Sequence, residues 1–340
     1  MRTDSKRPVV LLGHMYHPEA EARLRAAVPV EVLAQPEAVQ IKEALREACG
    51  AFLRYPNRLR ADALETAAHL RIVSTSGRGT DAIDIAAATA RGIAVVNNPA
   101  FGTVPVSEYT IGVMIAFAKN LLPLNQLTHA GQGWAAQKTY RRFELRGRTL
   151  GIIGLGNIGS EVARCCTQAF RMRVLAYDPY VPAEKAARVG AEWVSDLGRI
   201  WRESDFVSVH AELNDGTRGM VGEAALAAMR PNAYLINTAR GPIVSSDALA
   251  AALRAKRIAG AALDVYEEEP LPADSPLAGL DNLILSPHTG GLTEEAMRGM
   301  ALSAADQILQ ALRGERPPHL VNPQVWREPE RAASNKGESR

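Results

Sequence analysis

The sequence predicts an α/β fold with two doubly wound parallel-sheet domains and a cleft between them. The chain has 340 residues, whereas a single hydrophobic core stops growing near ~250–300 residues. Short apolar runs typical of strands alternate with amphipathic runs typical of helices. This alternation occurs twice, on either side of a polar, glycine-containing connection at 129–148.

The first series of elements occupies about the first hundred residues. Helices are expected where apolar residues recur at i, i+3 and i+4, and strands where short apolar runs lie between turn residues. Gly92 is expected to end the last of these helices. Strands are predicted at 8–13, 30–34, 51–55, 71–76 and 93–98, and helices at 19–27, 38–48, 61–68 and 81–92.

The second series begins at Thr149, after a long apolar helix predicted at 107–127. A last amphipathic helix is predicted at 293–312, and it could pack on either domain. The tail at 327–340 is charged and lacks apolar anchors, so we expect disorder there. Strands are predicted at 149–153, 173–178, 205–210, 233–238, 259–265 and 282–287, with helices at 157–170, 223–229 and 246–255.

Composition excludes several classes of protein. The 39 Lys and Arg against 37 Asp and Glu leave a net charge of +2, which argues against nucleic-acid binding by bulk charge. No apolar stretch is long enough to cross a membrane, and we expect no secretory signal. The three cysteines form no C-x-x-C, so neither a disulfide framework nor a metal site is expected, and a cytoplasmic location fits.

A G-x-G-x-x-G turn at 154–159 follows an apolar strand and opens a helix. In that context Gly154 allows the tight turn, Gly156 lets a pyrophosphate approach the backbone, and Gly159 lets helix and strand pack closely. The helix that begins at Asn157 and Ile158 would offer N–H groups to the phosphates. The turn therefore predicts a dinucleotide site.

Asp178 ends the next strand, about twenty residues after the turn. Its carboxylate would accept hydrogen bonds from the ribose hydroxyls and repel a 2′-phosphate, which favours NAD over NADP. The alternative is a glycine-rich turn beside a solvated acid.

Polar side chains follow three later strands of the same predicted sheet: Arg240, Asp264 with Glu267–Glu269, and His288. Ligands of open α/β sheets lie at the carboxyl ends of the strands. A His can take the hydroxyl proton of a 2-hydroxy acid, a carboxylate can orient it, and an Arg can hold the substrate carboxylate. Each residue also has a simple structural alternative, such as a surface ion pair or a solvated acidic run.

From about residue 8 to 323 the sequence resembles the D-isomer-specific 2-hydroxyacid dehydrogenases. The motifs that carry the resemblance are GRTLGIIGLGNIGSEVA, YDPY, LINTARGPIV, ALDVYEEEPLP and SPHTGG, with TSGRGTDAIDI in the first series. It implies a catalytic set of Arg240, Glu269 and His288. NAD contacts are expected at Gly154, Gly156, Asn157, Ile158, Gly159, Asp178, His210, Thr217, Thr238, Ala239, Arg240, Asp264, His288 and Gly290. Substrate contacts are expected at Arg54, Gly77, Arg78, Gly79, Arg240 and His288.

The resemblance also implies the roles of the domains. A discontinuous, flavodoxin-like substrate domain would comprise 1–104 and 294–326, and a Rossmann NAD domain 105–293. The last helix would then return to the first domain, and the helix at 107–127 would lie at the contact of a homodimer. The implied activity is NAD-dependent oxidation or reduction at C2 of a small acid of the glycerate/hydroxypyruvate, glyoxylate or phosphoglycerate type. A sensor or corepressor-like protein that binds NAD(H) is the alternative.

The sequence departs from the family pattern at four positions. Glu212 and Asn214 replace the usual Pro and Thr of the loop after His210. Gly102 replaces an Asn before the long helix. Arg78 occupies a position that is usually small or apolar, and with Arg54 it could bind a second anionic group on the substrate; the alternative is that both arginines face solvent.

Overall fold

The computed structural model describes residues 6–326, so the predicted disordered tail at 327–340 lies outside the described residues. The chain divides into two units. The first unit comprises Met1–Phe101 and Glu294–Arg340, and the second comprises Gly102–Thr293.

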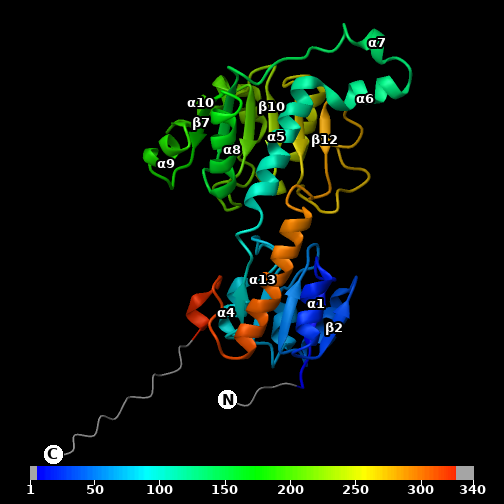
Figure 1. Ribbon diagram of the computed structural model, residues 1–340, viewed down its shortest axis with the longest axis vertical. Coiled ribbons are helices and arrows are strands. Elements are labelled where there is room, and N and C mark those ends of the chain that lie inside the picture. The colour runs from blue at the N-terminus through cyan, green and yellow to red at the C-terminus, as the bar shows by residue number, and fades with distance from the viewer. Residues whose placement is uncertain (1–5, 327–340) are drawn as a thin grey trace, which may run out of the picture. The chain divides into compact units, whose positions relative to one another are not determined.

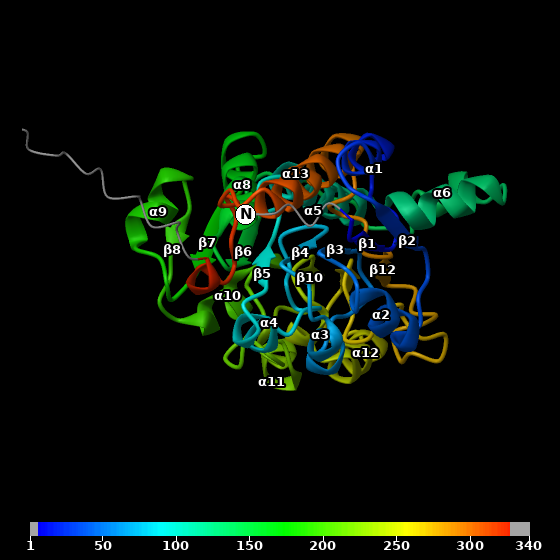
Figure 2. The same cartoon turned by 90° about the horizontal axis from the view of Figure 1, so that it is seen from below.

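The first unit is a five-stranded parallel sheet with helices on both faces (Figures 1 and 2). Its strand order, β2-β1-β3-β4-β5, is the flavodoxin-like order, which changes direction between β1 and β3. The strands are β1 (Val9–Leu12), β2 (Val30–Leu33), β3 (Gly50–Leu53), β4 (Ile72–Thr75) and β5 (Ala94–Val96). The helices are α1 (Pro18–Arg25), α2 (Ala38–Leu45), α3 (Ala61–Thr66), α4 (Ile85–Ala90) and α13 (Glu294–Leu312), followed by a 3-10 turn at Pro323–Val325.

Helix α13 packs on this first sheet beside α1 (Figure 2). Its small residues Ala301, Ala304 and Ala305 are fully buried in the same core as Val9 and Phe52. Small side chains let the helix approach the sheet closely. Helix α13 therefore belongs to the first unit, to which the chain returns after completing the second.

The second unit is a seven-stranded parallel sheet of order β12-β11-β10-β9-β6-β7-β8, a Rossmann arrangement that changes direction between β6 and β9. Its strands are β6 (Thr149–Ile153), β7 (Arg173–Tyr177), β8 (Glu192–Trp193), β9 (Phe206–Val209), β10 (Tyr234–Asn237), β11 (Gly260–Leu263) and β12 (Leu283–Leu285). Helices α5 (Thr103–Lys119), α8 (Asn157–Gln168) and α9 (Ala183–Arg188) cover one face. Helices α10 (Leu197–Glu203), α11 (Glu223–Ala228) and α12 (Ser246–Arg254) cover the other. Two parallel-sheet α/β domains, as predicted, are thus confirmed.

The prediction of one continuous helix at 107–127 is wrong. Helix α5 ends at Lys119, and α6 (Leu121–His129) begins beyond Asn120, whose φ of 51° is left-handed. Asn tolerates this conformation better than most residues, so it can end a helix in this way. No residue of α6 is buried, and α6 and the short α7 (Gly133–Ala136) extend away from the second sheet (Figure 1).

The described residues contain no helix that is both long and apolar enough to span a bilayer. Within 6–326, no three His, Cys, Asp or Glu side chains gather where they could hold a metal ion.

Candidate active site

The glycine turn after β6 is folded tightly against the loop after β9. Gly154 has a φ of +94°, and a Cβ there would lie 2.6 Å from the backbone nitrogen of Ala211. A Cβ on Gly159 would lie 2.1 Å from the carbonyl oxygen of Gly154. Neither position can carry a side chain without backbone movement, and Gly154 needs a conformation that L-residues rarely adopt.

The same turn leaves room on its outer side. Gly156 is the N-cap of α8, no side chain caps this helix, and a Cβ on Gly156 would meet nothing within 4 Å. The N-terminal N–H groups of α8, from Asn157 and Ile158 onward, therefore adjoin open space at the positive end of a helix. A pyrophosphate fits this arrangement.

Asp178 follows β7 and closes one side of the turn. Its Oδ2 accepts a hydrogen bond from the N–H of Leu155 at 2.8 Å, and its Oδ1 accepts one from the N–H of Tyr180 at 2.9 Å. Each carboxylate oxygen can accept a further hydrogen bond, so the side chain can both shape the turn and accept from ribose hydroxyls.

His210 directly follows β9, beside the turn. Its Nε2 lies 2.9 Å from the Ser208 hydroxyl, while its Nδ1 is buried and has no hydrogen-bond partner. Burial lowers the pKa of His210 to about 4, so the ring is neutral at neutral pH. A neutral imidazole with one unpaired buried nitrogen is a polar group that a bound cofactor or an ordered water could satisfy.

In the loop after His210, Glu212 and Asn214, which replace the Pro and Thr usual in the family, both form hydrogen bonds within the loop. The Thr217 hydroxyl donates to the carbonyl of Glu212 at 2.6 Å, and the Asn214 side chain accepts from the N–H groups of Gly216 and Thr217. Thr217 is thus engaged within its own loop, and its contact with the cofactor stays a prediction.

His288 and Glu269 meet at the carboxyl ends of β11 and β12. His288 Nδ1 lies 2.8 Å from Glu269 Oε2, and Glu269 Oε1 accepts from the N–H of Tyr266 at 3.0 Å. The Glu269 side chain is 9% exposed and that of His288 is 42% exposed. A shielded carboxylate therefore orients an imidazole whose other side is accessible.

Asp264 holds the loop that carries His288. Its carboxylate accepts from the Ser286 hydroxyl at 2.6 Å and from the N–H groups of Thr289 and Gly290, each at 2.8 Å. Because Ser286 donates to Asp264, the Tyr109 hydroxyl, 2.6 Å away, donates to Ser286. These contacts stabilise His288 in a left-handed conformation with a φ of 55°.

Tyr109 and Ser286 are residues that the sequence did not single out. Ser286 directly follows the apolar residues of β12, which is the only sequence signal for it. Tyr109 lies in the apolar helix α5, where nothing in the local pattern distinguishes it from a core residue.

Arg240 follows β10, and the Asn237 side chain stabilises the turn that contains Arg240 through two hydrogen bonds. The Asn237 amide donates to the carbonyl of Arg240 at 2.9 Å and accepts from the N–H of Ala239 at 3.0 Å. A Cβ on the next residue, Gly241, would lie 1.8 Å from the carbonyl carbon of Tyr266. The Arg240 turn thus lies directly against the segment that begins the Glu269 loop.

Thr238, in the same turn, lies with its hydroxyl 3.5 Å from that of Thr110 in α5. Strands β10, β11 and β12 are neighbours in one sheet. The segment after each strand contains one residue of the predicted catalytic set.

Four of the predicted substrate contacts, Arg54, Gly77, Arg78 and Gly79, belong to the first unit, whereas Arg240 and His288 belong to the second. Arg54 follows β3, with its guanidinium carbon 4.5 Å from the ring centroid of Tyr16 and its Nη1 donating to the carbonyl of His14 at 3.3 Å. The loop Gly77–Arg78–Gly79 follows β4, and Arg78 is exposed. Both lie at carboxyl ends of the first sheet.

The Rossmann sheet, the glycine turn and the His–Glu pair define an NAD-dependent oxidoreductase. The sequence model described as "D-isomer specific 2-hydroxyacid dehydrogenase, NAD binding domain" matches residues 111–290. The chain belongs to this family, and its cofactor is NAD.

Named relatives agree with this assignment. The chain is 38% identical to D-3-phosphoglycerate dehydrogenase of Methanocaldococcus jannaschii over 92% of this chain and 59% of that protein. It is also 38% identical to glyoxylate reductase of Aeropyrum pernix, over 94% of this chain and 97% of that protein. Its fold is similar to that of the NADPH-dependent glyoxylate/hydroxypyruvate reductase of Sinorhizobium meliloti, solved with NADP and malonate, with a TM-score of 0.84, 27% identity and coverage of 96% and 99% of the two chains.

Proposed function

We propose that this protein transfers a hydride between NAD and C2 of a small D-2-hydroxy acid or 2-oxo acid of the glycerate/hydroxypyruvate, glyoxylate or phosphoglycerate type. The observation that carries the proposal is the His288–Glu269 pair, with Nδ1 of His288 2.8 Å from the carboxylate. Nδ1 of His288 is held by Glu269, and the proposal assigns proton exchange with the substrate to Nε2. The names of the three relatives above, a D-3-phosphoglycerate dehydrogenase, a glyoxylate reductase and a glyoxylate/hydroxypyruvate reductase, support this substrate range.

NAD, when bound, accepts the hydride in oxidation and its reduced form supplies it in reduction. His288 Nε2 removes the proton of the C2 hydroxyl in oxidation and returns it to the C2 oxygen in reduction. Glu269 keeps the ring oriented through its contact with Nδ1. The Arg240 guanidinium holds the substrate carboxylate through paired hydrogen bonds and polarises the C2 oxygen.

The proposal assigns NAD binding to the domain of residues 105–293. It assigns substrate binding by the loop after β4 to the domain of residues 1–104 with 294–326. In this proposal the N–H groups around Gly77, Arg78 and Gly79 bind the substrate carboxylate. Asp264, Thr238 and Ala239 lie at the nicotinamide end, and the α8 N-terminus binds the pyrophosphate.

A screen for oxidation of NADH by glyoxylate, hydroxypyruvate, phosphohydroxypyruvate, pyruvate and longer 2-oxo acids tests the function. We expect turnover with at least one acid, and a fall of ~10²–10⁴ in kcat for His288→Ala with little change in NADH affinity, as for loss of a general acid–base group. A protein that binds NADH but turns over none of these acids would instead be the NAD(H)-binding sensor.

Arg54 and Arg78 are proposed to bind a second anionic group, such as a phosphate, on the substrate. If so, phosphohydroxypyruvate has a higher kcat/KM than hydroxypyruvate, and Arg78→Ala removes this advantage. Equal kcat/KM values for the two acids in the wild type, or an advantage that survives Arg78→Ala, would contradict the assignment.

We also propose a homodimer in the cytoplasm. Leu121 and Leu122 at the start of α6 are 50% and 49% exposed, and Trp134 in α7 is 85% exposed. A second copy would cover these apolar side chains. Sedimentation velocity should show a dimer that Leu122→Glu weakens, and cell fractionation should recover the protein with the soluble enzymes.

A further inference from the structure

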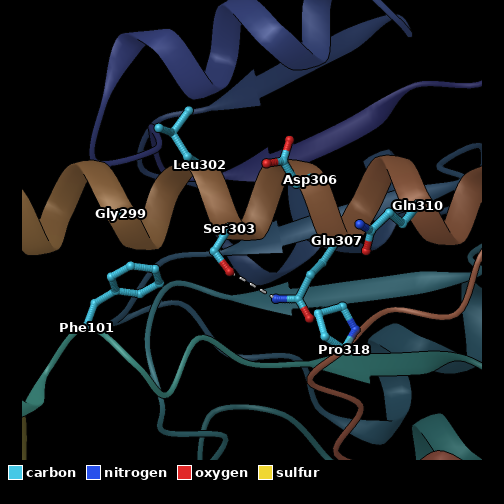
Figure 3. Close-up of a pocket in the computed structure, with 8 residues that line it drawn as sticks. All are labelled: Phe101, Gly299, Leu302, Ser303, Asp306, Gln307, Gln310 and Pro318. Carbon is cyan, nitrogen blue, oxygen red and sulfur yellow. Dashed lines mark hydrogen bonds between the residues drawn. The ribbon is translucent and has the colours of Figure 1, made fainter.

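Gln307 is a polar side chain in the buried face of α13, only 2% exposed. Its Nε2 donates to Asn98 Oδ1 and to the carbonyl of Asn97, each at 3.1 Å, and its Oε1 accepts from the N–H of His319 at 3.1 Å. Figure 3 shows the amide turned toward Ser303, one helical turn earlier, at 3.4 Å. Both ends of the amide are therefore hydrogen-bonded.

The two asparagines that Gln307 contacts hold the loop after β4. The N–H of Asn98 donates to the carbonyl of Gly77 at 2.8 Å, and the Asn97 amide donates to the carbonyl of Arg78 at 2.8 Å. The Thr75 hydroxyl donates to the Gly77 carbonyl as well, at 2.7 Å. Asn98 is itself anchored, because its Nδ2 donates to the carbonyl of Thr75 at 2.7 Å.

These contacts determine where the N–H groups of the loop point. In a planar trans peptide the carbonyl and the following N–H point in opposite directions. Holding the carbonyls of Gly77 and Arg78 toward Asn97 and Asn98 therefore directs the N–H groups of Arg78 and Gly79 to the other side of the loop. Two adjacent N–H groups on one side are suited to bind a carboxylate.

We propose that Gln307 is a positioning residue for substrate-carboxylate binding, acting through Asn98 and Asn97 on the N–H groups of Arg78 and Gly79. This inference rests on the proposed function, which assigns the loop to the carboxylate. It links a residue near the end of the chain to a loop more than two hundred positions earlier.

The test is the affinity of the NADH-bound full-length protein for oxalate, a carboxylate that undergoes no hydride transfer, measured by calorimetry. Gln307→Met keeps the length of the side chain and removes its hydrogen bonds. We expect the Kd for oxalate and the KM for the 2-oxo acid to rise about tenfold, as for loss of about one hydrogen bond's net contribution. The Kd for NADH and kcat should stay within about threefold of wild type.

Gln310→Met is the matched control. Gln310 lies on the same helix and lines the same cavity as Gln307, but its Oε1 has no hydrogen-bond partner (Figure 3). Its substitution should leave both oxalate affinity and KM unchanged. If Gln307→Met does not fold, Asn97→Ala at a half-buried position removes one carbonyl contact of the loop and should weaken oxalate binding in the same direction.

Three outcomes separate this inference from the proposed function. A folded Gln307→Met protein with wild-type oxalate affinity overturns the positioning role while leaving hydride transfer intact. Oxalate binding that depends on Gln307 in a protein without turnover supports the positioning role and overturns the proposed reaction. A wild-type protein that does not bind oxalate overturns the positioning role directly.

Discussion

His288 Nδ1 lies 2.8 Å from one oxygen of Glu269, and the other oxygen of the same carboxylate accepts the backbone N–H of Tyr266 at 3.0 Å. One largely shielded carboxylate thus joins the loop after β11 to the loop after β12. Both of its oxygens are used as acceptors, so the orientation of the imidazole is coupled to the backbone that carries Glu269.

Because both oxygens of Glu269 accept hydrogen bonds, we expect Glu269→Gln to lower kcat by more than loss of the negative charge alone would. A glutamine offers one acceptor oxygen, so its amide nitrogen must face either the Tyr266 N–H or the imidazole. We expect kcat to fall about 10- to 100-fold at unchanged NADH affinity. The matched control is Glu268→Gln at the exposed neighbouring position, which should retain wild-type turnover; equal rates for both variants would remove Glu269 from the mechanism.

The Tyr109–Ser286–Asp264 chain predicts a non-additive pair of substitutions. Ser286→Ala leaves the Tyr109 hydroxyl without this acceptor and removes one of the three hydrogen bonds that Asp264 accepts, so we expect a loss of about 1–3 kcal/mol in the free energy of unfolding. Tyr109→Phe in the Ser286→Ala background removes the unsatisfied hydroxyl and should recover part of that loss. Chemical denaturation of the single and double variants measures the coupling, and simple additivity would contradict a direct hydrogen bond.

Asp178 is predicted to select NAD over NADP. Its carboxylate would repel a 2′-phosphate, so Asp178→Ala should shift the ratio of kcat/KM for NADH over NADPH about tenfold or more toward NADPH. Glu184→Ala, an exposed acid in α9, controls for a general change in surface charge. A ratio that does not move would show that Asp178 shapes the turn without contacting the ribose.

The buried His210 should lower the free energy of unfolding at acidic pH. Burial lowers its folded-state pKa to about 4, below an ordinary value near 6.5. The unfolded chain therefore takes up a proton that the folded chain does not, and stability falls as pH decreases from about 6.5 toward 4. Between pH 7 and pH 5, wild type should lose about 2 kcal/mol more than His210→Gln. Parallel pH dependences of the two proteins in chemical denaturation would contradict a buried neutral imidazole.

Much of the fold follows from local patterns. The apolar runs within 8–13, 93–98 and 149–153 become β1, β5 and β6 because a strand buried on both faces is apolar along most of its length. The glycine turn was recognisable because its spacing and its place between strand and helix are local features. His288 and the acidic run Glu267–Glu269 could be proposed because they follow strands of the same parallel sheet, and the family resemblance then singled out Glu269.

Other elements carry weak local signals. The edge strand β8 has two residues, and α9 and α10 have six and seven, too few turns for periodicity to distinguish them. The break at Asn120 was missed because the apolar pattern continues into α6. Hydropathy records how apolar a segment is, and a single left-handed residue can redirect the chain without changing that pattern.

The sequence by itself determined the two α/β series, the dinucleotide turn and the residue types at the strand ends, since these depend on neighbours along the chain. The family resemblance implied that the last helix returns to the first domain, whereas only the tertiary structure decided that Ser286 joins Tyr109 to Asp264 and that Gln307 contacts Asn98. Such pairings depend on which distant segments share a core and on the directions of their side chains, and a hydrogen bond across that distance leaves no period in the sequence.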